Sequence, residues 1–144
     1  DYITIHASGG MEMMKAAQDA AGGIKLLAVT VLTSLDDSAL QDVGQQTPAA
    51  AQVLSLAKLV HDSGLPGIVC AGPDVESVRL SLPKPFVLMV PGIRPAGSAV
   101  GDQKRVMTPN EAIMSGATHL VIGRPITGAP DPAAAAADIL ASLK

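Results

Sequence analysis

Aromatic side chains are almost absent from this chain of 144 residues, which has one tyrosine, Tyr2, one phenylalanine, Phe86, and no tryptophan. Hydrophobic residues nevertheless make up 48% of the sequence. Because each fully buried aliphatic side chain contributes about 1.5–3 kcal/mol, this composition predicts a sizeable aliphatic core. The length fits one ordinary domain, which we place over residues 1–144.

Several other features are scarce, and each scarcity excludes a class of protein. One cysteine, Cys70, rules out an internal disulfide and suits a cytoplasmic protein. A net charge of −3 without a basic cluster argues against nucleic-acid binding. The longest apolar run, near residues 26–32, is far below the roughly 20 residues that span a bilayer, so we expect no membrane partner. The histidines lack metal-ligand spacing, so we expect no metal.

Short apolar runs alternate with helical patterns along the whole chain. Strands are predicted at residues 2–7, 25–31, 67–70, 86–90 and 118–122. Helices are predicted at residues 11–21, 36–43, 48–64, 74–80, 109–116 and 132–143. This alternation predicts an α/β fold with a parallel sheet and right-handed crossovers.

Three of the helix starts have clear capping signals. Thr47 before Pro48 predicts a hydroxyl cap followed by proline in the first turn. Residues 108–111 (TPNE) form a capping box, and Asp131 precedes Pro132 at the start of an alanine-rich helix. We expect these residues to fix where the helices begin.

Polar residues that suit an anion follow the predicted strands. Gly123 allows a ligand close to the backbone, and Arg124 offers a planar fork of donors that fits phosphate. Arg94 and Gln103 lie in the loop after the preceding strand. Since the loops after the last two strands of α/β barrels often bind phosphate, we interpret these residues as an anion grip. The alternative for Gly123 and Arg124 is a plain surface turn.

His6 stands at the end of the first predicted strand, next to the same sheet edge. It is either an acid or base of a reaction or a hydrogen-bonded structural residue, and the sequence favours the structural role. Cys70 lies within a predicted buried strand and is expected to be a small core residue.

Taken in order and spacing, five motifs closely resemble the bacterial type of orotidine 5'-phosphate decarboxylase. They are residues 5–10 (IHASGG), 27–34 (LAVTVLTS), 91–95 (PGIRP), 101–103 (GDQ) with 105–109 (RVMTP), and 121–127 (VIGRPIT). The resemblance implies a (β/α)₈ TIM barrel, of which this chain would cover about strands 4–8. It also implies a homodimer that converts orotidine 5'-monophosphate to uridine 5'-monophosphate and carbon dioxide in pyrimidine biosynthesis, without metal or organic cofactor.

The resemblance also implies roles for particular residues. Thr33 would contact the pyrimidine and Pro91 would line the base pocket. The phosphate would be held by Arg94, Gln103, Gly123 and Arg124, and residues 96–105 would form a lid over the ligand. The family's catalytic Asp-x-Lys-x-x-Asp motif has no counterpart in this sequence, so no catalytic residue is assigned to this chain.

The missing motif agrees with a second feature, the start of the chain. The chain begins inside a strand-like run at Asp1, so we expect it to start within something longer, with strands one to three supplied by a further segment or a second chain. The alternatives are a related sugar-phosphate decarboxylase or epimerase barrel, and a phosphate-binding half-barrel without catalysis. The segments 32–34 and 91–94 favour the pyrimidine enzyme.

Overall fold

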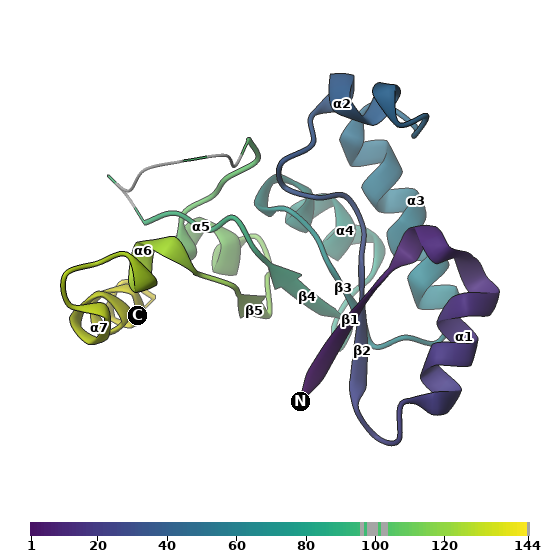
Figure 1. Cartoon of the computed structure of the whole chain (residues 1–144), viewed down its shortest axis with the longest axis horizontal. Coiled ribbons are helices and arrows are strands. Elements are labelled where there is room, and N and C mark those ends of the chain that lie inside the picture. The colour runs from purple at the N-terminus through teal and green to yellow at the C-terminus, as the bar shows by residue number, and fades with distance from the viewer. Residues whose placement is uncertain (96, 98–100, 102–103, 144) are drawn as a thin grey trace.

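The computed structural model describes residues 1–95, 97, 101 and 104–143. In this part of the chain five strands form one sheet in the order of the sequence, and every neighbouring pair is parallel (Figure 1). The strands are β1 (Tyr2–His6), β2 (Lys25–Val29), β3 (Gly67–Val69), β4 (Val87–Val90) and β5 (His119–Leu120). The predicted parallel sheet is confirmed. Strand β4 ends at Val90 as predicted, and the other four strands end one or two residues earlier than predicted.

Helices connect the strands, as the alternating pattern predicts. They are α1 (Gly10–Ala20), α2 (Asp37–Asp42), α3 (Ala49–Asp62), α4 (Val75–Ser81), α5 (Pro109–Met114), α6 (Arg124–Thr127) and α7 (Pro132–Ala141), with short 3₁₀ turns η1 (Ala7–Gly9) and η2 (Gly72–Asp74). The short helix α6 begins at Arg124, at a position where the sequence analysis places no helix. Figure 1 shows α6 and α7 beyond β5, at the opposite end of the sheet from α1.

Two of the predicted helix caps are confirmed and one is wrong. Thr108 and Glu111 form the expected capping box at α5, and Asp131 accepts backbone hydrogen bonds from Ala133 and Ala134 at α7. Helix α3 is capped differently, because the first free amide, that of Ala49, donates to the Asp37 carboxylate at 2.8 Å.

The Thr47 hydroxyl lies elsewhere, since it accepts a hydrogen bond from the Gln41 side chain at 3.4 Å. Helix α2 therefore supplies the cap of α3 from 12 residues earlier in the chain. This arrangement ties the loop after β2 to the start of α3.

The core lies between the sheet and the helices α1, α3 and α4. Its fully buried members include Met14, Val53, Ile68 and Leu88, and the predicted core position of Cys70 is confirmed at 1% exposure. Because these side chains come from helices and central strands alike, the core fixes the helices over one face of the sheet. The strand ends, where ligands bind in such folds, are thereby held in fixed relative positions.

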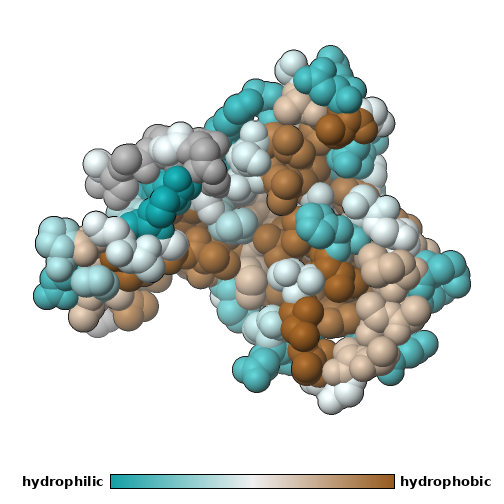
Figure 2. Space-filling view, in the orientation of Figure 1, coloured by the Kyte–Doolittle hydropathy of each residue, from teal (hydrophilic) through white to brown (hydrophobic). Residues whose placement is uncertain are grey.

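Apolar side chains also lie on the surface near the sheet. Ile3 of β1 is 50% exposed, and Leu32 and Val121, which follow β2 and β5, are 48% and 45% exposed. Figure 2 shows hydrophobic residues gathered on the visible face of the molecule. In the described part of the chain, β1 and β5 form the two edges of the sheet and each pairs with one strand.

Candidate functional site

The predicted site residues share one edge of the sheet. Thr33 follows β2, Pro91 and Arg94 follow β4, and Gly123 and Arg124 follow β5. Because the strands are parallel, their carboxyl ends meet at the same edge, where α/β folds place their ligands. Gln103 lies outside the described residues.

Arg94 is held firmly just behind the end of β4. Arg94 is 8% exposed. Its backbone N–H donates to the carbonyl oxygen of Met107 at 3.0 Å, and its side-chain Nη1 donates to the carbonyl oxygen of Ile93 at 2.9 Å. Ile93 and Met107 also form a parallel bridge. The two arms of the loop after β4 are therefore paired with each other at the level of Arg94.

Arg124 is exposed at the start of α6 and lies against the same loop. A side chain at Gly101 would place its Cβ 2.9 Å from Arg124 Nη1, so the loop backbone passes directly beside the guanidinium. Gly101 has a φ of +68°, a conformation that glycine adopts without strain. The structure thus brings the loop after β4 to Arg124. The convergence of Arg94, Gln103 and Arg124 on one anion stays a prediction.

Thr33 is half-buried in the loop after β2 and contacts the far arm of the loop after β4. Its carbonyl oxygen accepts a hydrogen bond from the backbone N–H of Lys104 at 3.2 Å. The Lys104 ammonium forms an ion pair with Asp36 and donates a hydrogen bond to its carboxylate at 2.6 Å. This hydrogen bond holds the pKa of Asp36 below its usual value. A pocket of about 510 Å³ opens beside this contact, and it is lined by Asp36, Asp37, Ser38, Ala49, Lys104 and Arg105.

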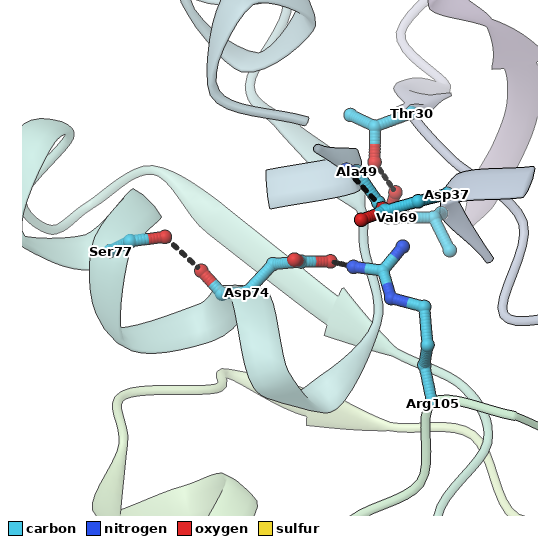
Figure 3. A network of polar contacts seen from close by, with 7 residues as sticks. All are labelled: Thr30, Asp37, Ala49, Val69, Asp74, Ser77 and Arg105. Carbon is cyan, nitrogen blue, oxygen red and sulfur yellow. Dashed lines mark hydrogen bonds and ion pairs between the residues drawn. The ribbon is translucent and has the colours of Figure 1, made fainter. Parts of the chain in front are cut away.

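A buried ion pair joins Arg105 to Asp74, and sequence reasoning missed it. The side chains are 12% and 3% exposed, and Figure 3 shows the Arg105 guanidinium directed at the Asp74 carboxylate. Burial raises the pKa of Asp74, while the charge and hydrogen bond of Arg105 act to lower it. Asp74 ends η2 and Arg105 lies 31 positions later, in the loop after β4, so no local pattern links them.

Cys70 and His6 have different surroundings. Burial, followed by the negative charge of Asp74, raises the pKa of the Cys70 thiol to about 12, so the thiol stays protonated at neutral pH. His6 ends β1 with an exposed side chain at the carboxyl edge of the sheet. Its role as an acid, a base or a structural residue stays a prediction.

Other features lie away from this edge or are lacking in the described residues. A pocket of about 700 Å³ lies between α4 and α5 and contains none of the predicted site residues. Among residues 1–95, 97, 101 and 104–143, no group of three His, Cys, Asp or Glu side chains is placed to hold a metal ion. No helix in that part of the chain has both the length and the apolar character needed to cross a bilayer.

A parallel sheet with arginine, threonine and glycine residues at the carboxyl ends of its strands is typical of α/β proteins that bind ligands at that edge, barrels among them. The sequence profile of the orotidine 5'-phosphate decarboxylase / HUMPS family matches residues 1–139. The chain therefore belongs to the orotidine 5'-phosphate decarboxylase / HUMPS family.

Relatives with curated names support this assignment. The chain is 52% identical over 147 residues to orotidine 5'-phosphate decarboxylase of Idiomarina loihiensis, covering 99% of this chain and 64% of that protein. It is 54% identical over 142 residues to the protein of the same name from an Anaeromyxobacter species, covering 98% and 63%. The chain thus spans less than two thirds of the length of these relatives.

The fold agrees with a solved structure in the family. All of the chain matches 63% of the crystal structure of orotidine 5'-phosphate decarboxylase from Lactobacillus acidophilus, with a TM-score of 0.84 and 38% identity. The expected fold class is confirmed, because the chain forms part of a (β/α)₈ TIM barrel.

Proposed function

We propose that this chain supplies the phosphate- and base-binding part of an orotidine 5'-phosphate decarboxylase active site. The observation that carries the proposal is the placement of Thr33, Arg94 and Arg124 at one edge of the sheet, on the loops after β2, β4 and β5. Relatives about half identical to this chain have that enzyme's name. The reaction breaks the bond between the pyrimidine ring and its carboxylate, releases carbon dioxide and protonates the ring carbon that remains.

The chain's own residues would act mainly through binding. Arg94 and Arg124 would hold the phosphate by charge-assisted hydrogen bonds, with Gly123 allowing close approach of the backbone. Thr33 and Pro91 would contact the base. Binding energy from a phosphate remote from the reacting carbon can be used to stabilise the transition state.

The proton donor would come from elsewhere in the barrel. We expect the catalytic lysine and its neighbouring carboxylates to lie in the part of the barrel that the relatives have in addition to the segment matched here. That part would also pair with β1 and β5 and cover exposed apolar side chains such as Ile3, because unpaired sheet edges promote aggregation. A second copy of the complete barrel, forming a cytoplasmic homodimer that uses no cofactor, completes the proposal.

The proposal is tested with the complete barrel that contains this chain. Purified protein is mixed with orotidine 5'-monophosphate, and the loss of the substrate's absorbance is followed together with the release of carbon dioxide. Turnover that yields uridine 5'-monophosphate supports the proposal. Binding of uridine 5'-monophosphate without turnover would point to a phosphate-binding barrel that lacks catalysis. Turnover of a sugar phosphate in its place would point to the related decarboxylases or epimerases.

A further inference from the structure

Residues 104–107 form a bridge between the two described parts of the candidate site. At one end, the backbone N–H of Lys104 donates to the carbonyl oxygen of Thr33 at 3.2 Å. At the other end, the carbonyl oxygen of Met107 accepts from the backbone N–H of Arg94 at 3.0 Å. This segment therefore contacts the backbone of the predicted base-binding residue and that of a predicted phosphate-binding residue.

The middle of the bridge is fixed by the buried ion pair. Arg105 extends from the segment to the carboxylate of Asp74. Asp74 is the last residue of η2, and the whole residue is 2% exposed. Next to this pair, the segment packs so closely on η2 that a Cβ at Gly72 would come within 2.5 Å of the Met107 Cβ. Arg105 Nη2 donates to the Asp74 carboxylate. Arg105 Nη1 is also buried, and it has no hydrogen-bond partner within the described residues.

A second ion pair on the bridge is far less suited to fix it. Lys104 and Asp36 form a contact at 2.6 Å, but their side chains are 51% and 47% exposed. Exposed pairs contribute little and are weakened by salt, whereas separating a buried pair leaves an uncompensated charge away from water. Since the two pairs lie next to each other on one segment, they provide a natural comparison.

We propose that Arg105, held by Asp74, is a positioning residue that sets the spacing between Thr33 and Arg94. The inference rests on the proposed function, because it takes Thr33 as the base contact and Arg94 as a phosphate contact. A nucleotide must satisfy both contacts at once, so a shift of the bridge changes how well one rigid ligand spans them. A ligand that occupies a single contact does not sense this spacing.

The experiment compares ligands that span the site with ligands that occupy half of it. Titration calorimetry or a competition assay on the complete barrel gives the dissociation constants of uridine 5'-monophosphate, uridine and ribose 5-phosphate. The variants are Arg105→Met, which removes the charge, Arg105→Lys, which keeps the charge, and the double exchange Asp74→Asn with Arg105→Gln, which keeps hydrogen bonding without buried charge. The matched control is Asp36→Asn, which removes the charge of the exposed pair and retains an oxygen to cap α2.

For Arg105→Met we expect the affinity for the nucleotide to fall on the order of 10- to 100-fold, which corresponds to the loss of one well-aligned hydrogen bond to a charged phosphate. Uridine and ribose 5-phosphate should bind as they do to the unmodified barrel. Arg105→Lys should restore part of the lost affinity, and Asp36→Asn should leave all three constants unchanged.

Two other outcomes would overturn the inference. If all three ligands weaken by the same factor, Arg105 only maintains the fold, and if none weakens, the bridge does not set the spacing. If Arg105→Met fails to fold, the double exchange decides by the same comparison. An unmodified barrel that binds no nucleotide would contradict the proposed function itself, which separates that failure from a failure of this inference.

Discussion

Arg124 is exposed whereas Arg94 is buried, and this difference determines what substitution of each residue tests. Replacing Arg94 removes a side chain that hydrogen-bonds within its own loop, so loss of binding would be mixed with local rearrangement. Replacing Arg124 at the surface of α6 should leave the fold intact. A substitution of Arg124 therefore tests phosphate binding with less risk of a change in structure.

We expect Arg124→Ala in the complete barrel to weaken binding of uridine 5'-monophosphate by about 1.5–3 kcal/mol, because one hydrogen bond to a charged group is lost. Arg124→Lys should recover part of the loss, since a lysine keeps the charge and loses the planar fork. Calorimetric titration measures both variants. An affinity equal to that of the unmodified barrel would reject the role assigned to Arg124.

Thr33 is predicted to contact the base and not the phosphate. Thr33→Val removes the hydroxyl but keeps the branched shape, and the backbone carbonyl that binds Lys104 remains. We expect weaker binding of uridine 5'-monophosphate and unchanged binding of ribose 5-phosphate. The two dissociation constants, measured side by side, check this, and equal losses for both ligands would disprove the assignment.

The buried pair of Asp74 and Arg105 should affect the stability of the fold and the dependence of that stability on pH. Breaking a buried pair from one side typically costs about 3–5 kcal/mol, so Arg105→Met should unfold at a lower urea concentration. The pKa of Asp74 is already raised by burial, and loss of the guanidinium should raise it further.

The sign of the pH dependence follows from this shift. A carboxyl whose pKa is higher in the folded state binds its proton more tightly there, so stability falls as pH rises from the unfolded value, near 3.8, through the folded value. The difference in the free energy of unfolding between the unmodified protein and the less stable Arg105→Met should thus grow between pH 4 and neutral pH. Urea unfolding across that range measures it, and a deficit that shrinks as pH rises would contradict the raised pKa.

At the scale of elements, local signals predicted most helix starts and failed where the fold supplied the cap. Thr108 with Glu111, and Asp131, act within three residues of themselves, so the sequence alone was sufficient. Helix α3 takes its cap from Asp37, which lies 12 residues before Ala49. A contact between two elements leaves no local pattern, and Thr47 offered a local pattern that the structure does not use as a cap.

This correction can be measured. Asp37→Ala should destabilise the protein by about 0.5–2 kcal/mol, the usual cost of removing a helix cap, while Asp37→Asn should cost much less. Thr47→Ala is the control and should have a small effect, because the Thr47 hydroxyl accepts a long hydrogen bond from the exposed Gln41 side chain and does not cap α3. The free energies of unfolding in urea give the comparison. A larger loss for Thr47→Ala than for Asp37→Ala would show that Thr47 is the functional cap.

At the scale of the whole molecule, the order of the elements was predictable from the sequence. Apolar runs at residues 25–31 and 67–70 mark strands buried by helices, and the parallel pairing follows from the helices between them. What the sequence could not predict is which loops meet after folding. The bridge from Thr33 through residues 104–107 to Arg94, and the buried pair of Asp74 with Arg105, depend on three separate strand ends being neighbours.

The central claim is that Arg94 and Arg124 bind one phosphate group together at the carboxyl edge of this sheet. A crystal structure of the complete barrel with uridine 5'-monophosphate tests it most directly. We predict that the phosphate oxygens lie within hydrogen-bonding distance of both guanidinium groups, with the base beside Thr33. A phosphate that contacts neither arginine, or a nucleotide bound away from the loops after β2, β4 and β5, would contradict the account.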